Sequence, residues 1–107
     1  MLKNDKIDCI CLCTPSGEHA KQAMQAIKAG KHVIIEKPVC ISVDDANALL
    51  KATDETNKIV SVISQNRFTD GSVEMKRAID ENLFGKIVSA SLTMRYYRSQ
   101  EYYDSGS

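Results

Sequence analysis

The fold of this 107-residue chain is decided by one stretch, Gly30-Lys31-His32-Val33-Ile34-Ile35-Glu36-Lys37-Pro38. Its aliphatic run, residues 33–35, is typical of a short strand that is covered on both faces of a parallel sheet. Pro38 has no N–H to donate, so the strand ends just before it. Because ligands of open α/β sheets bind at the carboxyl ends of the strands, Glu36 and Lys37 are expected at the mouth of a crevice.

Strands and helices alternate on both sides of this stretch. The expected strands are residues 7–13, 33–35 and 58–63, and the expected helices are residues 18–29, 43–56 and 72–82. Gly30 is placed to end the first helix, and Ser42 with Asp45 forms a capping box for the second. A strand, a helix and a strand within about 30 residues predict a right-handed βαβ unit. The chain is therefore expected to be an α/β protein with three β-α units.

The pattern of the chain changes at Gly85. Apolar and polar residues alternate from Val88 to Tyr97, which indicates an antiparallel strand with one face in solvent. We therefore expect a domain boundary at Gly85, with residues 86–97 as the first strand of a second domain. The polar, tyrosine-rich tail at residues 98–107 is expected to be poorly ordered.

Charge and composition exclude several classes of function. Lys plus Arg and Asp plus Glu number 14 each, so no net charge attracts nucleic acid or an anionic membrane. The longest apolar runs have the length of strands, which argues against a membrane span. Residues 1–6 lack the apolar core of a signal peptide. Four cysteines in such a chain favour a cytoplasmic location, where thiols stay reduced.

Four short motifs occur in a specific order and spacing. They are Thr14-Pro15 followed by His19, Ala29-Gly30-Lys31-His32-Val33 running into Glu36-Lys37-Pro38, Gln65-Asn66-Arg67-Phe68, and Gly85-Lys86-Ile87. Together they resemble the Gfo/Idh/MocA family of nicotinamide-dependent sugar and polyol oxidoreductases, over residues 7–107. The resemblance implies NAD or NADP as the cofactor. It also implies hydride transfer from a CH–OH group of a small-molecule substrate that is a sugar, a polyol or a nucleotide sugar.

One departure from the family pattern affects the expected architecture. Family members carry a G-x-G-x-x-G turn for the pyrophosphate, whereas no two glycines here lie within three residues of each other. The resemblance therefore implies that residues 1–85 are the second half of a Rossmann-like doubly wound parallel sheet. Residues 86–107 would then be the first strand and tail of an α+β substrate domain. The glycine-rich half and most of the substrate domain are expected outside these 107 residues, and the fragment alone is expected to be inactive.

The half sheet is expected to have an exposed edge. In the strand order 3-2-1-4-5-6, the three strands here correspond to strands four, five and six, so residues 7–13 lack a neighbour. An apolar edge strand is a template for pairing with another chain, so we expect a homo-oligomer, formed through this edge or by swapping of the C-terminal strand. The second hypothesis for the chain is a non-catalytic α/β module that only self-associates and binds no cofactor.

The resemblance implies that Lys37 is the catalytic residue. It would meet the reacting hydroxyl of the substrate and assist the loss of its proton. The alternative is a solvated lysine at a strand end, which is a common situation for this residue type. If the three strands lie side by side, Thr14, Lys37 and Asn66 share one rim of the sheet.

The resemblance also implies a set of contacts to the cofactor. These residues are Thr14, Pro15, His19, Glu36, Pro38, Asn66 and Arg67. Structural alternatives exist for several of these residues. Thr14 and Pro15 would form an ordinary turn, and His19 would be a helix-face histidine. Glu36 would instead be a surface acid paired with a lysine, and Arg67 an interdomain ion-pair residue. The Lys37–Pro38 peptide bond is a candidate for the cis form.

Three cysteines alternate along the first strand, at positions 9, 11 and 13. They lie on one face with a repeat of about 6.6 Å, whereas zinc needs thiolates that converge on one point. The pattern therefore favours small buried apolar side chains under a helix over a metal site.

Overall fold

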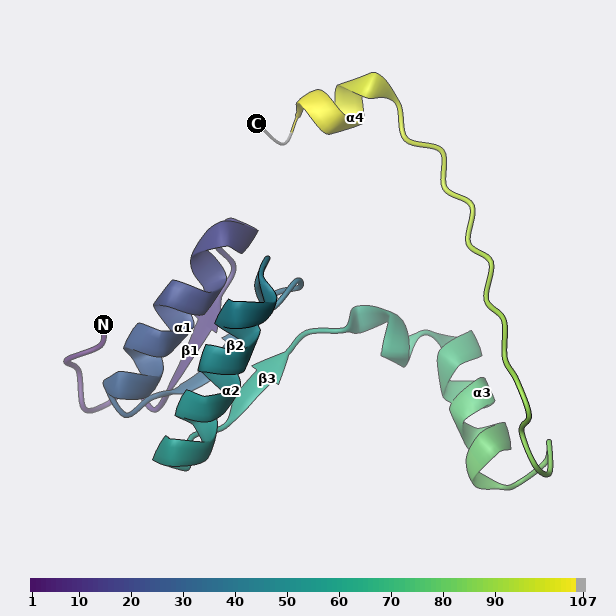
Figure 1. The fold of residues 1–107 in the computed structure, drawn as a ribbon, viewed down its shortest axis with the longest axis horizontal. Coiled ribbons are helices and arrows are strands. Elements are labelled where there is room, and N and C mark those ends of the chain that lie inside the picture. The colour runs from purple at the N-terminus through teal and green to yellow at the C-terminus, as the bar shows by residue number, and fades with distance from the viewer. Residues whose placement is uncertain (106–107) are drawn as a thin grey trace. The chain divides into compact units, whose positions relative to one another are not determined.

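The computed structural model describes residues 1–105, within two compact units, Met1–Thr69 and Asp70–Ser107 (Figure 1). The first unit holds the sheet and two helices. Residues 106 and 107, the end of the tail that was expected to be poorly ordered, lie outside the described residues. The compact division falls at Thr69, and the domain boundary at Gly85 stays a prediction.

The sheet has three parallel strands, β1 (Cys9–Leu12), β2 (His32–Ile35) and β3 (Val60–Val62), in the order β1-β2-β3. Ile10 stands opposite Val33, and Val33 stands opposite Val60. The parallel direction and the strand order confirm the predicted α/β class. They are those expected of the second half of a Rossmann sheet.

The two helices of the first unit begin and end at the residues that the sequence marks. Helix α1 (His19–Lys28) is followed by Gly30, whose φ of +76° is the left-handed conformation that glycine adopts without a Cβ clash. Helix α2 (Val43–Thr56) begins after Ser42, whose Oγ accepts a hydrogen bond of 3.1 Å from the backbone N–H of Asp45.

A single hydrophobic core fills the space between one face of the sheet and the two helices. Its buried members are Ile10, Leu12, Ala23, Ala26, Ile27, Val33, Ile35, Leu49 and Ala52. The alanines of α1 have little side-chain volume and therefore allow the helix to lie close to the sheet. Complete burial of a side chain such as Ile35, which is 0% exposed, contributes about 1.5–3 kcal/mol to folding.

The opposite face of the sheet is not covered in this unit. Cys9, Cys11 and Cys13 are exposed, so the expectation that these thiols are buried under a helix is wrong. Successive side chains on a strand point to opposite faces, and α1 and α2 cover the face that holds Ile10 and Leu12. Among the described residues, no cluster of three or more His, Cys, Asp or Glu side chains is placed to hold a metal ion.

The second unit contains α3 (Asp70–Asp80), which begins two residues before the predicted helix and ends two residues before its end. Arg77 donates to Glu81 at 2.7 Å and to Glu74 at 3.0 Å, and these carboxylates, Glu81 first, raise the pKa of its guanidinium. Asn82 and Gly85, both at positive φ, follow the helix. Positive φ is typical of residues that end a helix.

The rest of the second unit differs from the sequence prediction. Within the described chain, residues 86–99 pair with no strand, and Val88, Leu92 and Tyr96 are exposed. The expected antiparallel sheet is therefore absent from this part of the chain, because a strand needs a neighbouring strand with which to form backbone hydrogen bonds. The tail contains a short helix, α4 (Gln100–Asp104), where poor order was expected.

The helices within residues 1–105 all lack the combination of length and apolar composition that is needed to cross a bilayer.

Candidate cofactor and substrate site

Three segments follow the carboxyl ends of the three strands, and these ends lie on the same side of the sheet. Thr14 follows β1, Lys37 follows β2, and Asn66 lies in a short helical turn, Gln65–Phe68, after β3. The carboxyl ends of parallel strands lie on the same side of a sheet, and the backbone hydrogen bonds between the strands continue up to these ends. Glu36 N–H donates to Leu12 O at 2.9 Å, and Ile63 N–H donates to Ile35 O at 2.9 Å.

The Glu36-Lys37-Pro38 segment turns away from the ladder directly after β2. The backbone N–H of Lys37 donates to Oε2 of Glu36 at 2.7 Å, so the partner of this carboxylate is a backbone amide and not a lysine amine. The Lys37–Pro38 peptide bond is cis, as the sequence suggested. The side chain of Lys37 is exposed and accessible to a ligand.

His19, the first residue of α1, is 1% exposed. Its Nδ1 lies 2.8 Å from the carbonyl oxygen of Pro38, and its Nε2 lies 2.7 Å from the carbonyl oxygen of Thr14. The alternative of a helix-face histidine fits these contacts, because both partners lie within the chain. The predicted contact between His19 and a cofactor stays a prediction, although both ring nitrogens already have partners within the chain.

Gln22 is a site residue that the sequence analysis missed. Thr14 Oγ1 donates to Oε1 of Gln22 at 2.9 Å, which adds a second link between the turn after β1 and helix α1. His19 and Gln22 are three residues apart and therefore lie on the same face of the helix. That spacing is the signal by which Gln22 could have been found.

A polar cavity of about 260 Å³ lies between the ends of β2 and β3. Its lining consists of Lys37, Ser64, Gln65, Asn66 and Arg67. Among these side chains are an amine, a guanidinium and two amides, which can bind hydroxyl, carboxyl or phosphate oxygens through donated hydrogen bonds. No ion pair of Arg67 lies within the described residues, so its guanidinium is available to a ligand there.

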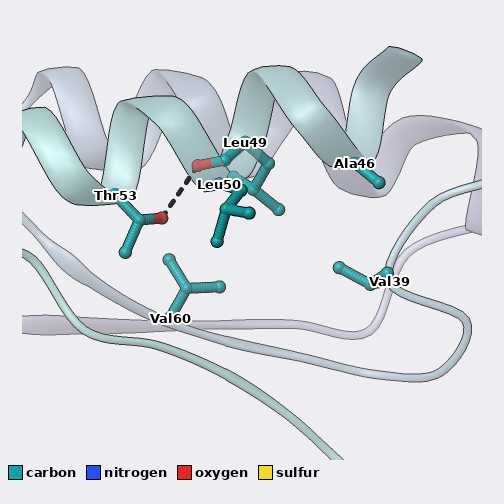
Figure 2. A pocket seen from close by; sticks show the side chains of 6 residues that line it. All are labelled: Val39, Ala46, Leu49, Leu50, Thr53 and Val60. Atoms are coloured by element: carbon teal, nitrogen blue, oxygen red, sulfur yellow. Dashed lines mark hydrogen bonds between the residues drawn. The ribbon is translucent and has the colours of Figure 1, made fainter. Parts of the chain in front are cut away.

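A second cavity, of about 190 Å³, has a different character. It lies between α2 and β3 and is lined by Val39, Ala46, Leu49, Leu50, Thr53 and Val60 (Figure 2). Its polar side chain, Thr53, donates its hydroxyl to Leu49 O at 2.8 Å and so is already satisfied. This apolar cavity therefore offers nothing that would orient a polar substrate, and the candidate site is the rim at Lys37.

The GFO_IDH_MocA family model, described as an oxidoreductase family with an NAD-binding Rossmann fold, matches residues 1–64. The chain is a member of the Gfo/Idh/MocA oxidoreductase family. The match includes the ends of all three strands and Lys37. It confirms the family, the fold and the NAD-binding class that the sequence motifs indicated.

Solved and curated relatives agree with this assignment. WlbA dehydrogenase from Bordetella pertussis, solved with NADH and UDP-GlcNAcA, is 38% identical with a TM-score of 0.86, over 97% of this chain and 31% of its own. The NADP(+) scyllo-inositol 2-dehydrogenase IolW of Bacillus subtilis is 31% identical over 88% of this chain and 26% of its own length. The NAD(+) scyllo-inositol 2-dehydrogenase of the same organism is 30% identical over 80% of this chain and 25% of its own length. The Gfo/Idh/MocA chain thus spans between 25% and 31% of these relatives.

Proposed function

We propose that this chain belongs to an NAD(P)-dependent dehydrogenase that oxidises a CH–OH group of a sugar, a polyol or a nucleotide sugar. The proposal rests on one observation: Lys37 lies at the carboxyl end of β2, in a polar cavity shared with residues 64–67 after β3. The 38% identity to WlbA favours a nucleotide sugar, because that relative was solved with NADH and a UDP-sugar.

The residues at the rim suit the nicotinamide side of the cofactor. We propose that Thr14, Pro15, Glu36, Pro38, Asn66 and Arg67 contact the cofactor or the substrate next to it. A bound nicotinamide supplies the acceptor for the hydride that leaves the carbinol carbon. The 107 residues contain no G-x-G-x-x-G turn, so this chain itself offers no pyrophosphate cradle of that kind.

Lys37 is the proposed catalytic residue. Its Nζ would hydrogen-bond to the oxygen of the reacting CH–OH group and assist the departure of the hydroxyl proton, while the carbon gives up its hydride. The two electrons leave with the hydride, and the proton passes from oxygen to the neutral amine of Lys37 or through it to water. Exposure of Lys37 at the cavity wall allows a substrate oxygen to approach it.

Titration with NADH and NADPH tests the proposal for this chain. The sequence contains no tryptophan, so the emission of the reduced nicotinamide can be followed without interference from that residue. Saturable binding in the micromolar range supports the dehydrogenase assignment and shows which cofactor is preferred. Absence of binding to both cofactors favours the second candidate, a module that only self-associates.

The second candidate is favoured by the outer edge of β1, which has no neighbouring strand within the described residues. Among residues 1–105, β1 pairs only with β2, and its two cysteines, Cys9 and Cys11, are exposed. An unpaired outer edge offers N–H and C=O groups to a second copy of the chain.

We also propose a cytoplasmic location, because all four cysteines are free thiols.

A further inference from the structure

We propose that His19 is a positioning residue that connects the segments after β1 and β2 and thereby holds Lys37 at the rim. We call the His19 ring and its two carbonyl partners, Thr14 O and Pro38 O, the His19 bridge. The inference rests on the proposed function only in naming Lys37 as the group that is held in place. It assigns to His19 a task other than contact with a cofactor.

The first argument is the position at which the sheet ladder stops. The last backbone hydrogen bond between β1 and β2 runs from Glu36 N–H to Leu12 O, at 2.9 Å. Beyond it, Lys37 N–H is used locally by the Glu36 carboxylate, and Pro38 has no N–H. Within residues 1–69, the hydrogen bonds that join the two segments after this point run through the His19 ring.

The second argument is the chemistry of the partners. A carbonyl oxygen only accepts, so the ring acts as the donor. A neutral imidazole carries one N–H and serves one of the two carbonyls, whereas the doubly protonated ring serves both. The two short contacts together require an N–H on each ring nitrogen, and no solvent competes for these N–H groups, because His19 is 1% exposed.

The third argument is that the anchor of the bridge is rigid. His19 begins α1, and the next residues on the same face, Ala23, Ala26 and Ile27, are fully buried in the core. Gln22 holds Thr14 Oγ1 at 2.9 Å from the same helix. Helix α1 is therefore held in the core by its buried face, and His19 attaches Pro38, and with it Lys37, to this helix.

The test uses substitutions that keep one arm at a time. Asn has an amide nitrogen at the position of Nδ1, so His19→Asn keeps the arm to Pro38. Gln places its amide nitrogen at the position of Nε2, so His19→Gln keeps the arm to Thr14. His19→Phe removes both donors and keeps a ring, and Lys21→Ala, exposed on the same helix, is the matched control.

The readout is the carbonyl 13C signal of each acceptor, measured in carbon-detected spectra of the 107-residue chain. These spectra include Thr14, whose carbonyl precedes a proline nitrogen. We expect both the Thr14 and Pro38 signals to move in His19→Phe, the Thr14 signal alone in His19→Asn, and the Pro38 signal alone in His19→Gln. The Lys37 amide signal should move with that of Pro38. Unmoved signals in His19→Phe, or the same pattern in the Asn and Gln variants, would overturn the proposal.

A measurement on the unsubstituted chain covers the case in which a variant does not fold. Both ring N–H groups of His19 should be visible in 15N-histidine spectra and protected from exchange with water, and the presence of fewer than two would also overturn the bridge. NADH titration separates this result from the proposed function. The expected carbonyl pattern without NADH binding keeps the bridge and removes the function from this chain, and NADH binding with unmoved carbonyl signals does the reverse.

Discussion

The backbone N–H of Glu36 donates to the carbonyl oxygen of Leu12 across 2.9 Å. This bond closes the ladder between β1 and β2 and places Lys37 beside the turn that begins at Thr14. The register of the parallel strands therefore groups the residues of the site.

Lys37→Ala should separate ligand binding from stability. The side chain is exposed, so the free energy of unfolding should change by less than about 0.5 kcal/mol. Loss of the hydrogen bond from Nζ to the substrate oxygen should weaken binding of a UDP-sugar about 10-fold, as expected for a hydrogen bond of about 1.4 kcal/mol. Calorimetric titration measures the affinity, with Lys51→Ala on helix α2 as the control. Equal affinities for the two variants would argue against a role for Lys37.

Cys11→Lys should reduce self-association through the edge of β1. A charge on an edge strand disfavours pairing with another copy. Ser61→Lys is the control, because Cys11, Ile34 and Ser61 stand in register across the same open face. Light scattering at micromolar concentration should give an oligomer for the unsubstituted chain and for Ser61→Lys, and a smaller mass for Cys11→Lys. A monomeric unsubstituted chain would contradict edge pairing, and equal effects of both lysines would indicate association that also involves β3, through its own outer edge or through the open face.

Ile35→Ala should destabilise the first unit by about 2–5 kcal/mol, because it opens a cavity in the core. Ile35 is 0% exposed, whereas Ile59, 67% exposed, provides a control with the same chemistry. Urea denaturation followed by circular dichroism measures both variants. Similar losses for Ile35→Ala and Ile59→Ala would mean that the core does not lie where the structure has it.

Ser42→Ala should cost about 1 kcal/mol, because Asp45 N–H then loses the acceptor that caps α2. Ser91→Ala, in the exposed extended segment, removes a hydroxyl without such a role. The same denaturation experiment compares the two variants. The cap would be without importance if both serines could be replaced at no cost.

Gly30→Ala should also cost about 1 kcal/mol, because Gly30 has a φ of +76°. A Cβ at this position would meet no atom within 4 Å, so the backbone conformation alone sets the cost. Gly71 has equally open surroundings but lies in α3 with an ordinary φ, so Gly71→Ala should not lower stability. Equal melting curves for the two variants would contradict this reasoning.

Local signals in the sequence were sufficient for the helices of the first unit. Ser42 and Asp45 fixed the start of α2, and the helix was predicted with the bounds that the structure shows, Val43–Thr56. Gly30 fixed the end of α1 because its positive φ is required there. The placement of Thr14, Lys37 and Asn66 after consecutive parallel strands followed from the alternation of strands and helices along the chain.

The sequence by itself determined the order of the elements and the family motifs, because caps, turns and periodicity depend on residues close together in the chain. Only the tertiary structure decided which face of β1 is buried. The run from residue 7 to residue 13 is apolar apart from Asp8, and α1 and α2 cover the face of Ile10 and Leu12 and leave the cysteines exposed. Only the tertiary structure joins His19 to Pro38, because these partners are 19 residues apart and meet through the packing of α1 on the sheet.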